Sequence, residues 1–342
     1  MVTMNSFVKY DSIENSSNHK AIEYITNHIL PNVEWCALEK IHGSNFSCTV
    51  NHDEIKWGKR SSYIDDDALC QFNNSHYIKE KYDENVVQLF HSVKEINPSA
   101  LSIRIFGEIC GGGYTGAKSS HPKSVKKVQK QIQYSPDIEF IVFDIKVFLE
   151  DESYYLDMDL VIQLCETTGM LYVPISFRGT LEEMLNLEPK YITNIPNMFE
   201  LPILDNNWSE GYVIKPINEI RKNGSRIILK HKNPDFTERY PSKSFKSNSI
   251  DTMTNDETLL IEKCYGYINQ NRIDNVLSKL MENEKLNRKK VSGLVFQDAL
   301  IDIMKDLNED EKLLFKEKRS HITGTMMCYS YDQCYTLSDA TP

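Results

Sequence analysis

The sequence contains no Cys-x-x-Cys spacing, no internal repeat of fixed period and no low-complexity tract. Its apolar runs stay far short of the roughly 18 residues that a membrane-spanning helix requires. The first residues lack the basic region followed by an apolar region that marks a secretory signal. These absences predict an intracellular protein, in the cytoplasm of a cell or of a virus-infected host, that is neither secreted nor inserted in a membrane.

Eight cysteines are scattered along the 342 residues, and this pattern predicts reduced thiols, not a disulfide framework or a zinc site. The length is enough for about two domains. With 40% hydrophobic and 26% charged residues, the composition is typical of a globular protein. The net charge of −10 argues against indiscriminate binding of nucleic acids.

Basic residues are nevertheless concentrated in two stretches. Residues 114–133 contain five lysines and no acid, and residues 221–246 contain eight lysines and arginines against two acids. A solvated surface would show the same pattern, but binding to phosphates needs only a local basic surface. Two such stretches in an acidic protein favour a polyanionic ligand.

The apolar periodicity predicts an α+β domain followed by a helical one. Helices are expected at 77–96, about 157–168 and 180–187, the last with a capping box that begins at Thr180. Strands are expected at 33–38, 46–50, 101–106, 138–145, 211–215 and 226–230. A polar turn containing Asn223 and Gly224 separates the last two. Three further helices are expected from about Asp256 onward, and the tail from Ser320 is expected to be irregular.

Lys40 and Gly43 lie in a short polar connection between two strand-like runs. A lysine held at the end of a strand can be aimed into a cleft, and a desolvated lysine can act as a nucleophile. Taken alone, the pattern is more typical of a surface lysine in a β-hairpin. The rest of the chain has to decide between these two interpretations.

Further polar residues stand at or near the ends of other expected strands. They are Lys59, Arg60, Glu108, Asp144, Glu210, Lys215, Lys230 and Lys232. Each could be a solvated surface group, but together they predict a site for a nucleoside triphosphate. Lys230 and Lys232 are two apart in a strand and share one face, and their charges would favour the unprotonated, nucleophilic form of Lys40. Glu108 and Glu210 could hold ribose hydroxyls and a hydrated Mg²⁺ ion.

These motifs, in this order, resemble those of the covalent nucleotidyltransferases, and most closely the phage RNA ligase 2 branch of the polynucleotide ligases. The matching segments are Lys40-Ile41-His42-Gly43, Lys59-Arg60, Phe106-Gly107-Glu108, Phe140–Ile145, Glu210–Pro216 and Leu229–Asn233. DNA ligases and capping enzymes usually have aspartate where His42 stands, so this histidine favours the RNA ligase branch. The C-terminal segments Asn271–Val276 and Val295–Asp298 are similar to that branch as well.

The resemblance implies an α+β nucleotidyltransferase domain, of the ATP-grasp-like ligase type, with antiparallel sheets flanked by helices at residues 1–245. A small all-helical RNA-binding domain would follow at 250–342. The implied activity is that of an ATP-dependent RNA ligase, which joins 3′-hydroxyl and 5′-phosphate ends, preferably at nicks in duplex RNA. It would act through a lysyl-AMP intermediate and an adenylylated RNA 5′ end, with Mg²⁺ or Mn²⁺. RNA is the implied partner, and we expect a monomer.

The resemblance also implies roles for individual residues. The implied catalytic residues are Lys40, Arg60, Glu210, Lys230 and Lys232. The implied ATP-binding residues are Glu39, Lys40, Ile41, His42, Asn45, Arg60, Glu108, Phe143, Glu210, Lys215, Lys230 and Lys232. Glu108 and Glu210 are the implied metal ligands. Arg272 and Asp298 would bind RNA, although the two could instead pair with each other between helices.

The chain departs from the phage pattern at three places. Leu38 stands where the phage enzyme has a basic residue, and Asp302 stands where a glutamate is expected. The segment from Gly111 to Gln133 is longer and more basic, so we expect an added loop that contacts RNA. Two alternatives remain: a catalytically inactive protein that binds RNA ends, and a DNA ligase or capping guanylyltransferase. The lack of an apparent β-rich OB domain argues against the second.

Overall fold

The structure is a computed structural model that describes residues 7–28, 33–222, 224–236 and 254–336. The chain divides into two compact units, Met1–Asp235 and Phe236–Pro342. The sequence places a domain boundary between residues 245 and 250, which lies outside the described residues.

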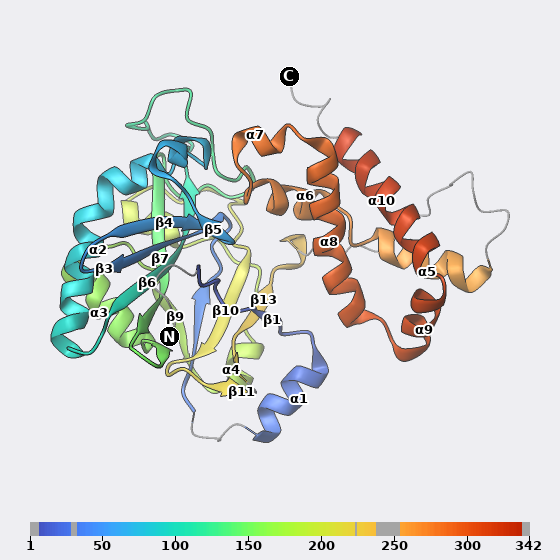
Figure 1. The fold of residues 1–342 in the computed structure, drawn as a ribbon, viewed down its shortest axis with the longest axis horizontal. Coiled ribbons are helices and arrows are strands. Elements are labelled where there is room, and N and C mark those ends of the chain that lie inside the picture. The colour runs from blue at the N-terminus through green and yellow to red at the C-terminus, as the bar shows by residue number, and fades with distance from the viewer. Residues whose placement is uncertain (1–6, 29–32, 223, 237–253, 337–342) are drawn as a thin grey trace. The chain divides into compact units, whose positions relative to one another are not determined.

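The first unit is built on two sheets, and nearly all of their strand pairs are antiparallel (Figure 1). One has the strand order β1–β13–β10–β2–β9, and the other has the order β5–β4–β3–β6–β7–β8. The strands of the first sheet are β1 (Glu14–Asn15), β2 (Trp35–Glu39), β9 (Ile175–Gly179), β10 (Gly211–Pro216) and β13 (Leu229–Lys232). The strands of the second are β3 (Ser44–Asn51), β4 (Ile55–Lys59), β5 (Ser62–Tyr63), β6 (Ser102–Gly111), β7 (Ile138–Phe148) and β8 (Ser153–Tyr155).

Helices cover these sheets because each presents an apolar stripe. They are α1 (His19–His28), α2 (His76–Ile96), α3 (Met158–Thr168) and α4 (Leu181–Leu185), with 3₁₀ turns at Asp66–Gln71, Ile195–Phe199 and Pro234–Phe236. Figure 1 shows α2 and α3 side by side along the six-stranded sheet, and both contact β7. The expected helix at 77–96 is confirmed as α2, which buries Ile78, Tyr82, Val86, Leu89, Phe90 and Val93. The predicted capping box of Thr180 and Glu183 is also present.

The connection from Lys40 to Gly43 joins the two sheets. β2 ends at Glu39 and pairs with β10 and β9, whereas β3 begins at Ser44 and pairs with β4 and β6. The two strands that bracket Lys40 are therefore not partners of one another, and the interpretation as a surface hairpin is wrong. The chain crosses from one sheet to the other at the lysine.

The strand expected at 226–230 is interrupted in the structure. Arg226 ends a short strand, β12 (Ser225–Arg226), which pairs with β11 (Arg221–Lys222), and β13 begins only at Leu229. The two residues between them, Ile227 and Ile228, pack into different apolar clusters. Each cluster holds the chain on one side. Of the expected turn, Asn223 lies outside the described residues.

The second unit is helical throughout its described part. Its helices are α5 (Asn255–Tyr265), α6 (Gln270–Leu277), α7 (Glu282–Lys285), α8 (Arg288–Asp306), α9 (Glu309–Glu317) and α10 (Arg319–Thr336). The expectation of an irregular tail from Ser320 is wrong, because α10 packs on α5 and α8 and buries Ile322 and Met326. Weak helix formers such as Gly324 hide this helix in the sequence, and tertiary packing stabilises it.

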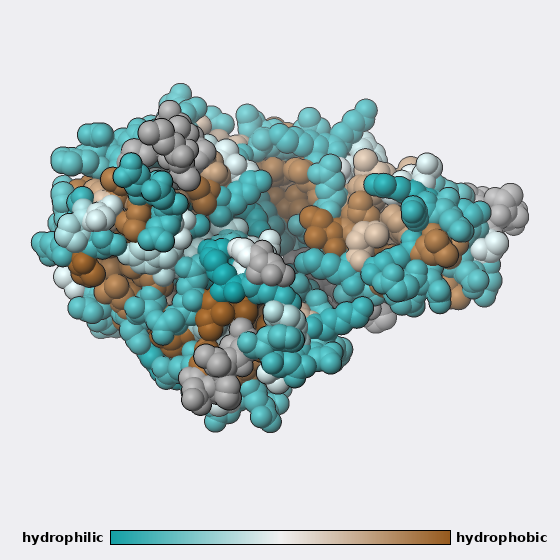
Figure 2. Space-filling model, turned by 60° about the horizontal axis from the view of Figure 1, so that its bottom comes forward, coloured by the Kyte–Doolittle hydropathy of each residue, from teal (hydrophilic) through white to brown (hydrophobic). Residues whose placement is uncertain are grey.

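The surface of both units is mostly hydrophilic on the face drawn in Figure 2. Most of the apolar side chains are buried in the cores of the two units. In the second unit one continuous cluster runs from Leu260 to Cys334, and clusters around Ile214 and Phe106 lie in the first unit. Among the described residues, no helix has both the length and the apolar character needed to cross a membrane.

Candidate active site

Lys40 is fixed at the point where β2 leaves its sheet. Its backbone N–H donates to the carbonyl of Gly211 at 2.8 Å, which extends the β2–β10 ladder by one residue. Its side chain reaches Glu210, with Nζ 2.9 Å from Oε2. Pairing of two strands that are distant in sequence therefore sets the lysine against a carboxylate.

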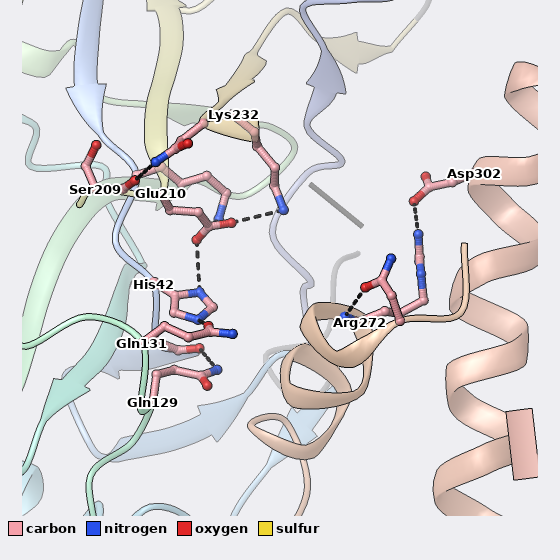
Figure 3. A network of polar contacts seen from close by, with 12 residues as sticks. His42, Gln129, Gln131, Ser209, Glu210, Lys232, Arg272 and Asp302 are labelled. Atoms are coloured by element: carbon pink, nitrogen blue, oxygen red, sulfur yellow. Dashed lines mark hydrogen bonds and ion pairs between the residues drawn. The ribbon is translucent and has the colours of Figure 1, made fainter. Parts of the chain in front are cut away.

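Glu210 is the centre of this cluster (Figure 3). Besides Lys40, its Oε2 contacts Nδ1 of His42 at 3.2 Å, and its Oε1 lies 3.0 Å from Nζ of Lys232. Burial alone would raise the pKa of Glu210, but the charges of Lys40 and Lys232, with the hydrogen bond from His42, hold it well below its usual range. The carboxylate is thus ionised at neutral pH and binds three groups at once.

The residue after Glu210 has to be glycine. Gly211 has φ +120°, and a Cβ there would lie 2.2 Å from the carbonyl oxygen of His231. This close approach lets the start of β10 lie beside the end of the antiparallel strand β13, since Gly211 is paired with Lys232. Asn233 secures the same corner with two hydrogen bonds of 2.9 Å, to the carbonyls of Glu210 and Ser209. Glycine is therefore needed after Glu210 because the two strands meet closely there, and this meeting places Lys232 beside Glu210.

A segment between Gln129 and Tyr134 contacts the lysine-to-glycine connection, whereas the sequence predicts for the loop up to Gln133 only a contact with RNA. The Tyr134 hydroxyl accepts the backbone N–H of His42 at 2.9 Å, and the Gln129 side chain donates to the carbonyl of Gly43 at 3.4 Å. Gln131 contacts Nε2 of His42 through its side-chain oxygen (Figure 3). The imidazole of His42 is therefore held at both nitrogens, by Gln131 and by Glu210.

Glu39 lies one residue before the lysine with its carboxyl group buried. The hydroxyl of Thr193 and the backbone N–H of Asn194, the latter at 3.1 Å, donate to its two oxygens. Burial raises the pKa of Glu39 to about 7, although these two hydrogen bonds act in the opposite direction. Thr193 and Asn194 belong to no motif, so no pattern in the sequence predicts this contact.

Phe143, Asp144 and Lys215 belong to a second, buried network. Asp144 binds Arg226 through both oxygens, at 2.6 and 3.2 Å, and it also accepts from Nζ of Lys215 at 3.0 Å and from the Tyr10 hydroxyl at 2.6 Å. Lys215 also donates to the carbonyl of Phe143 at 3.1 Å. The ring of Phe143 lies edge-on to Tyr10, with centroids 5.0 Å apart. In this structure Lys215 is engaged by Asp144, so its part in ATP binding stays a prediction.

The remaining residues predicted for ATP lie at the nearby ends of strands. Asn45 and Glu108 are partners across β3 and β6, and Arg60 is exposed in the turn after β4. Ile41 is buried within the connection. Lys230 is half-buried in β13 and is paired with Val213. These positions are compatible with the predicted roles and do not test them.

In the second unit, Arg272 is almost fully buried and pairs with two aspartates of α8. Its guanidinium contacts Asp298 and lies 2.8 Å from Oδ2 of Asp302, while its Nε donates to the carbonyl of Tyr267 at 2.7 Å. The structural pairing considered for Arg272 and Asp298 is therefore present. Contact of either residue with RNA stays a prediction.

A divalent ion would have to be held by few protein groups. Within the described residues there is no cluster of three or more histidine, cysteine, aspartate or glutamate side chains that could hold a metal. The two predicted ligands, Glu108 and Glu210, are single carboxylates. Because Mg²⁺ keeps several waters and needs only one or two carboxylates besides substrate phosphates, this donor set fits such an ion.

Two family models match the chain. The model described as RNA ligase matches residues 33–232, and the model described as T4 RNA ligase 2 C-terminal matches residues 251–327. The chain is 28% identical over 231 residues to RNA-editing ligase 2, mitochondrial, of Trypanosoma brucei brucei, covering 61% of this chain and 55% of that protein. It is also 28% identical over 258 residues to RNA-editing ligase 1, mitochondrial, of the same organism, with coverages of 64% and 54%. The chain thus spans about half the length of these curated relatives.

Among solved structures, the RNA ligase of Naegleria gruberi with PPi has a TM-score of 0.44 and 16% sequence identity, over 67% of this chain and 57% of that one. This likeness is too weak to carry an argument. The first family model, however, covers more than half of the chain and includes the cluster of Lys40, His42, Glu210 and Lys232. The chain belongs to the RNA ligase family.

Proposed function

We propose that this protein is an ATP-dependent RNA ligase that joins 3′-hydroxyl and 5′-phosphate ends, with nicks in duplex RNA as its preferred substrate. The observation that carries the proposal is the convergence of Lys40, His42 and Lys232 on Glu210. A lysine can act as the nucleophile in such a transfer, and a second cation beside it can neutralise charge on the transferred phosphate. The family to which the chain belongs supports RNA as the substrate.

In the first step Nζ of Lys40 attacks the α-phosphorus of ATP. A nitrogen–phosphorus bond forms, the bond from that phosphorus to the bridging oxygen breaks, and pyrophosphate leaves. The ammonium of Lys40 gives a proton to solvent water before the amine attacks. Glu210 orients the amine from 2.9 Å, and because its own pKa is held low it does not retain that proton. Lys232, on the other carboxylate oxygen, is placed to neutralise charge on the phosphates.

In the second step an oxygen of the RNA 5′-phosphate attacks the phosphorus of the bound AMP, and the nitrogen–phosphorus bond to Lys40 breaks. The lysine leaves as an amine and regains a proton. In the third step the neighbouring 3′-hydroxyl loses its proton and attacks the activated 5′-phosphate, which expels AMP. His42, held between Gln131 and Glu210, is suited to orient the phosphate in these transfers. The protein contributes positioning and charge neutralisation throughout.

The remaining site residues receive roles by position. Phe143 would stack on the adenine, Glu39 would lie at its edge, and Glu108 would bind the ribose. Arg60 and Lys230 would contact the phosphates. Glu210, with Glu108, would hold a hydrated Mg²⁺ or Mn²⁺ ion, which when bound neutralises charge on the triphosphate.

Transfer of label from ATP tests the first step. The protein is freed of bound AMP and incubated with Mg²⁺ and ATP labelled at the α-phosphate, and the wild type is compared with Lys40→Ala. Lys20→Ala, which changes an exposed lysine of α1, is the matched control. We expect label on the wild type and on the control, and none on Lys40→Ala. Absence of label on the wild type would refute the ligase reaction, and equal label on Lys40→Ala would remove Lys40 as the nucleophile.

A comparison of substrates separates the remaining alternatives. We expect a nicked RNA duplex to be sealed faster than two single strands, and ATP to be used in place of GTP. An inactive end-binding protein would bind the nick without taking label. Faster sealing of single strands would overturn the preference for nicks, and a requirement for DNA on both sides of the nick would identify a DNA ligase.

A further inference from the structure

The five lysines between residues 118 and 130 present their charges to solvent, whereas seven lysines elsewhere in the first unit are paired with carboxylates. All five are exposed, and in the part of the chain that the structure describes none of them forms an ion pair. Elsewhere in this unit the following lysines lie within 3.0 Å of a carboxylate oxygen: Lys40, Lys56, Lys79, Lys81, Lys190, Lys215 and Lys232. The described structure of the unit therefore does not use the charges of the loop lysines in ion pairs.

The second basic stretch of the sequence behaves in the opposite way. In its described part, Arg221 pairs with Glu219, Arg226 with Asp144 and Lys232 with Glu210. These cations hold the sheet and the candidate active site together. The five lysines of the loop are exposed, so their charge is available for a polyanionic ligand.

The loop is anchored on the body of the unit. Asp137 accepts hydrogen bonds of 2.6 to 2.8 Å from the hydroxyls of Ser119 and Ser120 and from the backbone of Ser120. The ring of His121 is stacked on Tyr77 near the start of α2, with centroids 4.0 Å apart. A loop fixed in this way loses less conformational entropy when it binds a ligand than a free chain would lose.

The far end of the same loop makes the contacts that hold His42. Gln129 and Gln131 contact Gly43 and His42, and Tyr134 accepts the backbone N–H of His42. Lys130, which is exposed, lies between the two glutamines, and Lys126 lies four residues before it. The exposed lysines are therefore next in the chain to the groups that position His42.

We propose that the exposed face of residues 118–130 binds the sugar–phosphate backbone of RNA beside the end that is being joined, and that this contact is transmitted to His42 through Gln129, Gln131 and Tyr134. The inference rests on the proposed ligase function and adds the surface that holds the polynucleotide. Lysines bind phosphates as point charges, so the contact reads the RNA backbone and not its bases. It serves the two steps that use RNA and is dispensable for the step that uses ATP alone.

The experiment uses three pairs of substitutions that remove equal charge. Lys118→Gln with Lys123→Gln, and Lys126→Gln with Lys130→Gln, change the loop. Lys9→Gln with Lys20→Gln changes two exposed lysines elsewhere in the unit. Binding to a nicked RNA duplex is measured by fluorescence anisotropy at salt concentrations from about 50 to about 200 mM. Over this range, affinity that depends on phosphate contacts falls steeply. Labelling by ATP and thermal unfolding show whether each variant is folded.

We expect each loop pair to weaken RNA binding roughly 10-fold and to reduce the slope of log K against log salt by about 2, since each phosphate contact contributes about 1. Sealing should fall with binding while labelling by ATP is retained, and the Lys9 and Lys20 pair should bind RNA like the wild type. Equal binding by all variants, or equal loss in the control pair, overturns the inference. Failure of the ligase proposal is a separate result, because the wild-type protein would then take no label.

Discussion

Gly43 packs directly against the carbonyl group of Ile109. A Cβ on Gly43 would lie 2.1 Å from the carbonyl oxygen of Ile109 and 2.8 Å from Cγ of Glu108. The need for glycine here comes from close approach of the backbone to β6, which fixes where the connection that carries Lys40 crosses between the sheets.

Substitution of this glycine should therefore disable the lysine. Gly43→Ala has to push the connection away from β6, and a displacement of about 1 Å at a reacting group can cost roughly 100-fold in rate. We expect the rate of labelling by ATP to fall by that order. Gly293→Ala is the control, because Gly293 lies inside α8 with no atom within 4 Å of the added Cβ. That change should raise the free energy of unfolding by about 0.5–1 kcal/mol. A Gly43→Ala protein that labels at the wild-type rate would contradict the assignment.

Gln131 should act as a positioning residue for His42. Gln131→Ala removes the contact at Nε2 and leaves the contact between Glu210 and Nδ1 in place. We expect kcat for sealing to fall about 10-fold or more with little change in KM for RNA. Gln131→Glu keeps an acceptor oxygen and should recover part of the rate, with the optimum moved to higher pH because a carboxylate favours the protonated imidazole. Gln163→Ala, at an exposed glutamine of α3, is the control. An unchanged pH profile in Gln131→Glu would show that the contact is only structural.

The buried carboxyl of Glu39 should make stability depend on pH. Burial raises its pKa from 4.5, the ordinary value of a glutamate, to about 7 in the folded chain. Between these values the unfolded chain releases the proton while the folded chain keeps it, so stability that is fully present below about pH 4.5 is lost as pH rises toward 7. The loss is about 3 kcal/mol. Glu39→Gln, an uncharged substitute, should remove this slope, which urea unfolding from pH 5 to 8 would measure. Parallel curves for the two proteins would refute the assignment.

Asp144 should be necessary for folding because it balances two buried cations. Burial alone would raise the pKa of Asp144, but Arg226 and Lys215 hold it below its usual range. Asp144→Asn leaves both cations without their carboxylate, which typically costs about 3–5 kcal/mol. Asp159→Asn breaks an exposed pair with Arg178 and should cost less than about 1 kcal/mol. Chemical denaturation of both variants gives the comparison, and similar costs for the two would show that the buried network contributes no more than a surface pair.

Local patterns in the sequence were enough to predict much of the fold. The apolar stripe of α2 and the capping box of α4 depend on residues three or four apart, so they can be read before the chain folds. The helix α10 could not, because its buried face includes Ser330, whose hydroxyl bonds to the carbonyl of Ser292 at 2.9 Å. A polar residue in a buried stripe breaks the apolar period, and its partner lies in another helix.

The candidate site divides in the same way. A Lys-x-x-Gly connection, a Glu-Gly pair at the start of a strand and two lysines two residues apart can be recognised without a structure, and so can the order of the motifs that resemble those of RNA ligases. The tertiary structure decided that Lys40 and Glu210, 170 residues apart, face one another at 2.9 Å. It also placed Gln131 on His42 and Thr193 on Glu39. The physical reason is that a strand pattern fixes which face a side chain occupies, whereas the pairing of β2 with β10 decides which side chains meet there.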